Sequence, residues 1–179
     1  MELRLADEQD WAGCAALPTS VQSTHVWQLS VVRDATQPLT SAEINVALRS
    51  LRLPRPVTVQ PAGPSLETLW PAAAAILVAE RDDQIAGYIV LTALPERPAL
   101  AVSRFVVAPT VRERGLASLL LRSAVRLATY QQYTALVANC SARNHPAVVC
   151  LTRNGFTFAG YSEAMYPRGE VALLWQRSA

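Results

Sequence analysis

The sequence predicts a single α/β domain over residues 1–179, with a mixed, mostly antiparallel central sheet and helices on both of its faces. Half of the residues are hydrophobic (51%), enough for one packed core in a chain of this length. Apolar strands at 76–80 and 85–91 are separated only by a short polar turn, which is typical of an antiparallel hairpin. Strand, helix and strand patterns then follow each other between residues 100 and 139, and such a connection favours a parallel pair.

The crossover helix is the most regular element in the sequence. It is expected from Gly115 to about Gln131, between strands at 100–107 and 134–139. Arg122 and Arg126 lie on its polar side. Five apolar residues lie on the other side at helical spacing: Leu116, Leu119, Leu120, Ala124 and Leu127.

The remaining elements are predicted from capping residues and local alternation. Thr40 and Glu43 have the spacing of a capping box, which predicts a helix over 41–51. The density of prolines between 53 and 71 predicts an irregular surface loop with a short strand at 57–59. The other expected elements are strands at 2–6, 26–32, 156–159 and 171–175, a helix from Asp7 to about Leu17, and a helix from Pro146 to Asn154.

Composition excludes several classes of function. The net charge of +2 is too small to indicate a nucleic-acid partner, and the arginines are scattered along the chain. The chain has no lysine, which excludes a lysine Schiff base and a Walker-type phosphate-binding lysine. The longest apolar run, 72–79, is far too short to span a membrane.

Cysteines and histidines give no metal-binding pattern. His25 and His145 are isolated in the sequence, so no metal site is expected. The odd number of cysteines and the absence of a signal peptide predict reduced thiols in the cytoplasm. The three cysteines are widely spaced: Cys14, Cys140 and Cys150.

The segment 105–117 predicts a binding site for a pyrophosphate. Pro109 ends an apolar strand, and Arg112 and Arg114 place two permanent cations just before Gly115 opens a helix. Glycine has no Cβ, so an anion can approach the backbone closely there. The N–H groups of a first helical turn lack intrahelical partners and lie at the positive end of the helix dipole.

With these residues the sequence resembles the GNAT family of N-acetyltransferases. The family's acetyl-CoA loop is written [Q/R]-x-x-G-x-[G/A] after a strand that ends in V-x-P. Residues 107–109 match the strand end, and residues 112–117 match the loop. The resemblance implies the family's fold, with the β-α-β crossover at the acetyl-CoA site, and acetyl-CoA as co-substrate.

A second family signature follows, in which an asparagine precedes a helix and Gly-Phe begins the next strand. Asn144, Ala147, Gly155 and Phe156 stand at the matching spacing. In the family this asparagine helps to hold the pantetheine arm, and Asn144 could also cap the helix, since the two roles can coexist. The residues that the resemblance implies for acetyl-CoA are Phe105, Val106, Val107, Arg112, Glu113, Arg114, Gly115, Leu116, Ala117, Ser118, Asn144, Cys150 and Leu151.

The proton carriers of the family are missing from their usual positions. The tyrosine that serves as general acid is replaced by Leu151, next to Cys150, whose thiol is a weak donor. Strand 100–107 has no carboxylate and carries Ser103 and Arg104 instead. Water could serve, because a thioester is already activated, with backbone groups of Val106 and Val107 stabilising the oxyanion. The candidate protein groups are Glu80, Tyr161 and Tyr166, with Glu163 near them.

The resemblance covers residues 74–175 well and residues 1–73 poorly. Within the family, residues 144–147, 155–157 and 171–175 resemble the streptothricin acetyltransferase-like branch. The leading interpretation is an enzyme that moves an acetyl group from acetyl-CoA to a primary amine of a small molecule or protein in a ternary complex. The alternative is a catalytically weak acyl-CoA-binding or sensing module. The acceptor cannot be identified from the sequence, and either a monomer or a homodimer is compatible with it.

Overall fold

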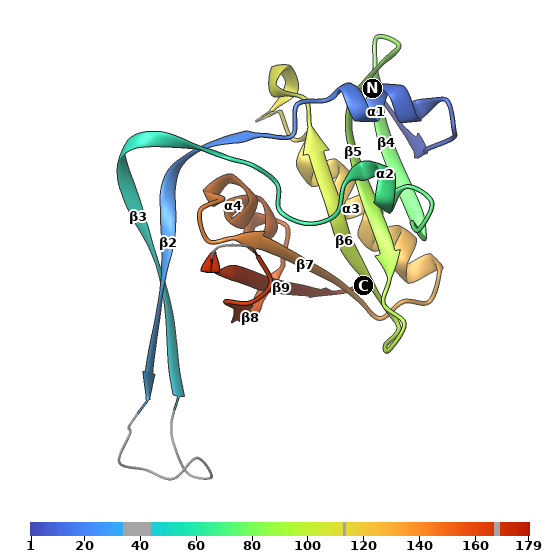
Figure 1. The fold of residues 1–179 in the computed structure, drawn as a ribbon. Coiled ribbons are helices and arrows are strands. Elements are labelled where there is room, and N and C mark those ends of the chain that lie inside the picture. Colours follow the sequence, from blue (N-terminus) through green and yellow to red (C-terminus); the bar gives the residue numbers. More distant parts are fainter. Residues whose placement is uncertain (34–43, 113, 167–168) are drawn as a thin grey trace.

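The computed structural model describes residues 1–33, 44–112, 114–166 and 169–179. A seven-stranded sheet forms the body, and a separate two-stranded hairpin extends from it (Figure 1). The strands are β1 (Glu2–Leu5), β2 (Val21–Arg33), β3 (Ile44–Val59), β4 (Ala75–Arg81), β5 (Gln84–Ala93), β6 (Ala99–Val107), β7 (Ala135–Ser141), β8 (Thr157–Ser162) and β9 (Ala172–Ser178). The helices are α1 (Asp10–Ala16), α2 (Leu66–Leu69), the 3-10 turn η1 (Pro109–Val111), α3 (Leu116–Tyr130) and α4 (His145–Arg153).

The large sheet has the predicted mixed character. Its strand order is β1-β4-β5-β6-β7-β9-β8, and only β6 and β7 pair in parallel. Helix α3 makes the crossover between these two strands, as the sequence predicts. The turn at Asp82 and Asp83 takes left-handed φ angles of 53° and 57° and closes the antiparallel β4–β5 hairpin.

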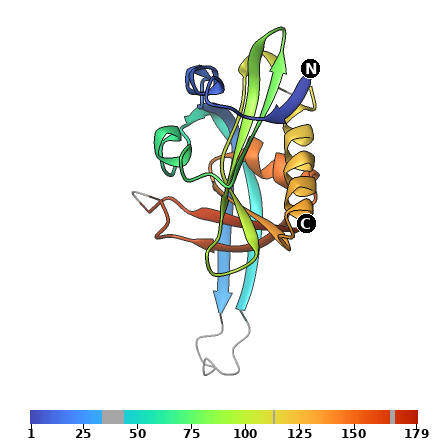
Figure 2. The ribbon, with the colours of Figure 1, turned by 90° about the vertical axis from the view of Figure 1, so that its right-hand side faces the viewer.

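Helices cover both faces of the sheet, which confirms the predicted layers (Figure 2). On one face, α3 and α4 pack over the larger hydrophobic core. The residues that α3 buries are Leu116, Leu120, Leu121, Ala124 and Ala128, so its buried stripe differs in part from the predicted one. On the other face, Cys14 of α1 and Leu69 of α2 pack over Tyr88 and Val106 in a second cluster.

The predicted helix over 41–51 is wrong from residue 44 onward, because these residues belong to strand β3. Residues 41–43, with the capping-box residues Thr40 and Glu43, lie outside the described residues. The loop predicted for 53–71 is also wrong in part, since β3 runs to Val59 and α2 follows. Pairing passes from His25–Arg52 to Ser23–Val57, so Pro54 and Pro56 lie in a bulge that needs no ladder hydrogen bond.

The hairpin β2–β3 is attached to the body at the start of α4. The Trp27 backbone N–H donates to the Ala142 carbonyl at 2.7 Å, and the Trp27 indole donates to His145 Nδ1 at 3.2 Å. The His25 and His145 rings lie with their centroids 4.5 Å apart and their planes tilted by 31°, so these histidines are not isolated in the fold. Burial, and then the neighbouring His25, lower the pKa of His145. No group of three metal-ligating side chains occurs among the described residues.

Candidate active site

The site is created by the divergence of the two parallel strands. β6 and β7 pair only from Ala99–Ala135 to Val102–Ala138. Beyond that point β6 continues beside β5, and β7 continues beside β9, so the two strand ends separate. No described residue pairs with the β7 side of β6 after Val102. The separated strands leave backbone groups facing a gap in the middle of the sheet.

A β-bulge in β6 lies at the point of separation. Leu91 pairs with Val102 and Val90 pairs with Arg104, which leaves Ser103 as an extra residue. The Ser103 hydroxyl contacts the Thr92 hydroxyl at 2.6 Å. Bulges redirect side chains and end pairing next to active sites. This bulge therefore accounts both for the separation of the strands and for the position of Arg104.

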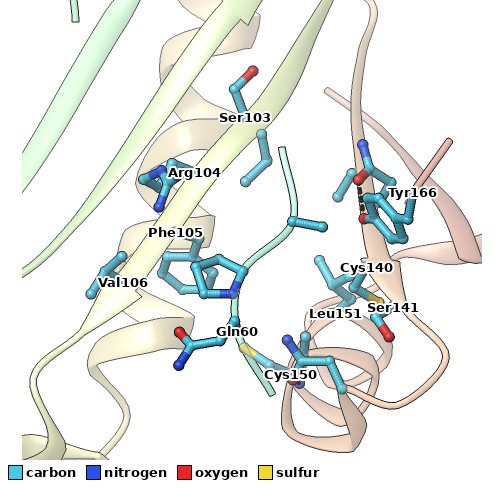
Figure 3. A pocket seen from close by; sticks show the side chains of 17 residues that line it. Gln60, Ser103, Arg104, Phe105, Val106, Cys140, Ser141, Cys150, Leu151 and Tyr166 are labelled. Carbon is cyan, nitrogen blue, oxygen red and sulfur yellow. Dashed lines mark hydrogen bonds between the residues drawn. The ribbon is translucent and has the colours of Figure 1, made fainter. Parts of the chain in front are cut away.

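A pocket occupies the gap between the strand ends (Figure 3). Helix α4 closes one side of it, and the segment that follows β3 lies across it. Tyr166 enters from the connection between β8 and β9. The residues that line the pocket are Gln60, Pro61, Ala62, Val102, Ser103, Arg104, Phe105, Val106, Ala138, Asn139, Cys140, Ser141, Asn144, Ala147, Cys150, Leu151 and Tyr166.

The predicted phosphate loop lies between β6 and α3. Gly115 is the N-cap of α3 and has φ 83°, a conformation that favours glycine. A Cβ built on Gly115 would have no atom of the described residues within 4 Å, so the described part of the chain leaves the space in front of this backbone open. The first turn of α3 contains no acidic residue that would repel an anion. Helix N-termini of this kind bind phosphate groups.

The Arg112 side chain is held by carbonyl groups of the protein and is not free to bind a phosphate. Its Nε donates to the Val107 carbonyl at 3.0 Å and its Nη2 donates to the Ser20 carbonyl at 3.1 Å. The guanidinium therefore fixes the shape of the loop and joins it to the segment before β2. Arg114 is exposed beside Gly115, and Glu113 lies outside the described residues.

The first turn of α3 is tied to the end of α4. Leu116 is buried in the core, while Ser118 accepts a hydrogen bond from Asn154 Nδ2 at 3.0 Å. The same amide donates to the Cys150 carbonyl at 2.8 Å. Ala117 lies between these two anchored residues at the helix start. The Asn154 amide therefore connects the start of α3 to Cys150, which lines the pocket.

Asn144 has the helix-capping role that was one of its two expected functions. Its Oδ1 accepts a hydrogen bond from the Ala147 N–H at 3.1 Å, at the start of α4. The residue also lines the pocket, together with Ala147 and Cys150. A side chain whose oxygen is held by the helix can still present its amide N–H to a ligand. The geometry is therefore compatible with both roles.

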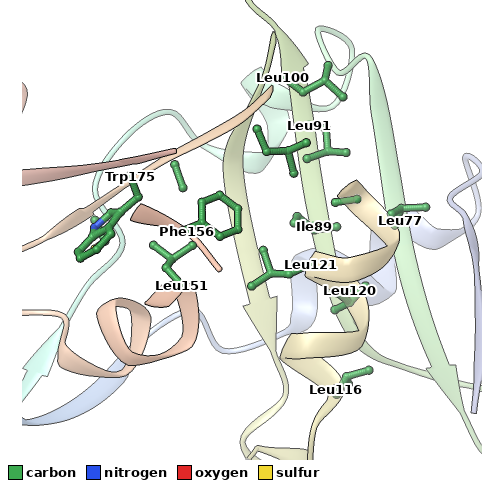
Figure 4. Close-up of a cluster of buried hydrophobic side chains, with 14 of the residues drawn as sticks. Leu77, Ile89, Leu91, Leu100, Leu116, Leu120, Leu121, Leu151, Phe156 and Trp175 are labelled. Carbon is green, nitrogen blue, oxygen red and sulfur yellow. The ribbon is translucent and has the colours of Figure 1, made fainter. Parts of the chain in front are cut away.

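Leu151 and Cys150 are neighbours on α4, and both line the pocket. Leu151 is 5% exposed, lines the pocket and belongs to the core with Phe156 (Figure 4). Burial raises the pKa of Cys150, and the Asn154 hydrogen bond offsets this only in part. Burial also raises the pKa of Cys140 to about 12. Both thiols therefore stay protonated and unreactive near neutral pH.

The three candidate proton carriers occupy different environments. Tyr166 is buried, lines the pocket and donates its hydroxyl hydrogen bond to Asn139 Oδ1 (Figure 3). Burial, and then Cys140 and Glu170, raise the pKa of Tyr166 well above its usual value. Tyr161 lies on the edge strand β8 and does not line the pocket. Glu80 is also outside the pocket and pairs with Arg4 at 2.8 Å.

Several pocket residues were not proposed from the sequence. Asn139 and Ser141 come from the end of β7, and Gln60 comes from the segment that was expected to be a surface loop. From the sequence, Arg104 was noted only as a residue of strand 100–107 that stands in place of a carboxylate. Their convergence depends on strand separation and on the β2–β3 hairpin, which no local pattern predicts.

Comparison with known protein families identifies the fold and the class. The model of the acetyltransferase (GNAT) family matches residues 45–156, more than half of the chain. The chain belongs to the GNAT family. None of the curated proteins matches this sequence. The described part of this GNAT protein contains no helix that is long and apolar enough to cross a membrane.

Two solved acetyltransferase structures share the fold of nearly the whole chain, and a third shares the fold of about two thirds of it. A nourseothricin acetyltransferase is 24% identical with a TM-score of 0.80, covering 99% of this chain and 97% of its own. A Bacillus anthracis protein assigned as a streptothricin acetyltransferase, solved with acetyl coenzyme A, is 16% identical with a TM-score of 0.77 and the same coverage. An IAA acetyltransferase from Bacillus cereus is 16% identical with a TM-score of 0.58, covering 66% of this chain and 87% of its own. At these identities the likeness is one of fold.

Proposed function

We propose that this protein is an acetyl-CoA-dependent N-acetyltransferase that acts on a primary amine by direct attack in a ternary complex. The separation of β6 from β7 beside an open helix N-terminus at Gly115 is the observation that supports this proposal. A structural neighbour was solved with acetyl coenzyme A, and the chain belongs to an acetyltransferase family. We further propose that residues 1–179 act as one domain, because the pocket uses residues from β3 to the β8–β9 connection.

Acetyl-CoA supplies an activated thioester, so the residues of the site have three tasks. The start of α3, from Gly115 to Ser118, holds the pyrophosphate through backbone N–H groups. Asn144 and the residues around Cys150 hold the pantetheine arm beside α4. Backbone groups at the end of β6, over Phe105, Val106 and Val107, orient the acetyl group and stabilise negative charge on its oxygen.

Binding and turnover measurements test the proposal together. Isothermal titration should show acetyl-CoA binding, and an amine panel followed by thiol detection should show turnover. Binding without turnover for any amine would favour the acyl-CoA-binding module, and the proposed activity would then be wrong. The absence of acetyl-CoA binding would contradict both functions.

The pH profile of turnover should give no sign of an enzyme acid whose pKa lies near neutrality. The rate should rise with pH while the substrate amine loses its proton, without a fall between pH 7 and 9. Because the pKa of Tyr166 is raised, its hydroxyl remains protonated throughout this range. Tyr166→Phe should therefore keep the profile and lower the rate less than about tenfold, since general acids contribute about 100-fold or more. A loss of about 100-fold or more in Tyr166→Phe would instead make Tyr166 the acid.

Restoring the family tyrosine should bring no gain in turnover. Leu151 packs among core side chains and also lines the pocket, so Leu151→Tyr places a larger, polar side chain against both. We expect the free energy of unfolding to fall by about 1–3 kcal/mol, with turnover unchanged or lower. Denaturant unfolding and thiol release measure the two effects. A clear gain in rate would show that proton delivery limits the wild-type reaction.

A further inference from the structure

Arg104 brings a positive charge to the wall of the pocket that β6 forms. It follows the bulged residue Ser103 and precedes the strand end by three residues. Figure 3 shows Arg104 on β6 and Tyr166 on the opposite side of the pocket. Val106, which also lines the pocket, is two residues further along the strand. Arg104 is thus close to the place where the acetyl group and the acceptor amine meet.

The guanidinium of Arg104 has few partners within the protein. Its Nη2 donates to the Pro64 carbonyl, and its Nε is buried without a hydrogen-bond acceptor. No carboxylate of the described residues lies within ion-pair distance of it. A guanidinium carries five N–H donors and stays charged at every relevant pH. A partly buried cation with one protein acceptor is costly unless an anion completes its environment.

The rest of the pocket offers no counter-ion on the same wall. The lining residues in the described part of the chain include no aspartate or glutamate. Glu170 is not among the lining residues, and it accepts a hydrogen bond from the Ser141 hydroxyl of β7. The β6 wall is therefore positive, and it disfavours acceptors that carry a second cation near the amine.

We propose that the acceptor is an amino acid-like small molecule whose carboxylate is bound by Arg104 while its amine faces the acetyl group. This inference rests on the proposed acetyltransferase function. The planar guanidinium fork matches a carboxylate geometrically, and charge-assisted hydrogen bonds are about twice as strong as neutral ones. The carboxylate replaces the missing counter-ion, and the short distance along β6 from Arg104 to Val106 selects a compact acceptor.

Three matched acceptors test this substrate class: an α-amino acid, its amide and its decarboxylated amine, taken across a panel of side chains. For the wild type, kcat/KM should be at least about tenfold higher for the acid than for either analogue. Arg104→Gln should abolish this preference by lowering kcat/KM for the acid alone, and Arg104→Lys should retain part of it. The acetyl-CoA dissociation constant and the melting temperature should stay close to those of the wild type.

The outcomes separate this inference from the proposed function. Equal use of the amide or decarboxylated amine by the wild type would overturn the carboxylate assignment while leaving the acetyltransferase intact. An equal loss for all three acceptors in Arg104→Gln would show that Arg104 only anchors the segment at Pro64. If acetyl-CoA binds without turnover, the N-acetyl amino acids can be titrated into wild type and into Arg104→Gln. Equal affinities of the two proteins for these compounds would overturn the inference.

Discussion

Replacing Gly115 by asparagine should lower acetyl-CoA affinity by about tenfold or more without unfolding the protein. Gly115 has φ 83°, a left-handed conformation that asparagine tolerates better than most residues. Among the residues that the structure describes, no atom lies within 4 Å of a Cβ at this position, so the new side chain would enter the space proposed for the pyrophosphate. Isothermal titration with acetyl-CoA measures the loss.

Gly155 provides a matched control for this substitution. It has φ 78° after the end of α4, and a Cβ there would lie 3.7 Å from the Arg177 side chain, an ordinary contact. Gly155→Asn should therefore cause similar backbone strain but leave acetyl-CoA affinity unchanged. Normal affinity in Gly115→Asn would rule out the proposed cradle. Equal losses in both variants would point to a general effect of strain on the fold.

Much of the body could be predicted because its signals are local. The β4–β5 turn, the amphipathic pattern of α3 and the proline at the start of α4 each determine an element within a few residues. The crossover through α3 then gives the single parallel pair, because a helical connection returns the chain to the same end of the sheet. The loop before Gly115 and the cap at Asn144 follow from the same short-range signals.

The β2–β3 hairpin could not be predicted because its strands are long and irregular. Prolines usually end strands, yet Pro54 and Pro56 lie in a bulge where β3 needs no N–H for pairing. The spacing of Thr40 and Glu43 favoured a helix, but residues from Ile44 onward pair with β2 instead. Tertiary contacts at Trp27 and His145 support this pairing, and such contacts override local propensity.

Some of the predicted site residues line one pocket, and other residues of that pocket were not predicted. The β6 end, Asn144, Cys150 and Leu151 come together around one pocket. Arg104 and Asn139 converge on it only because β6 and β7 separate and the chain from β3 crosses the gap. Those contacts join residues far apart in sequence, so motif spacing carries no information about them.

Replacing Arg4 by alanine should lower the free energy of unfolding by about 2–3 kcal/mol. Arg4 donates to both carboxylate oxygens of Asp10, at 2.6 and 2.8 Å, and Asp10 is only 7% exposed. The Asp7 N–H donates to the same carboxylate at 2.9 Å. Without Arg4 a buried negative charge loses its counter-ion, and α1 loses its link to β1. Denaturant unfolding at pH 7 measures the effect.

The pH dependence of the unfolding free energy gives a second test of the Arg4–Asp10 pair. The Arg4 hydrogen bond holds the pKa of Asp10 below its usual range, so the pair stabilises the fold fully above pH 4. The difference in unfolding free energy between wild type and Arg4→Ala should therefore stay constant from pH 5 to 8 and narrow as the pH falls below about 4.

Glu80 contacts Arg4 from the exposed side of this network, so Glu80→Gln should lower the free energy of unfolding by less than about 1 kcal/mol. Because Glu80 lies outside the pocket, Glu80→Gln should also keep wild-type turnover at every pH. A selective loss of activity at low pH in Glu80→Gln would restore this residue as a general base, whereas normal activity leaves amine deprotonation to the solvent.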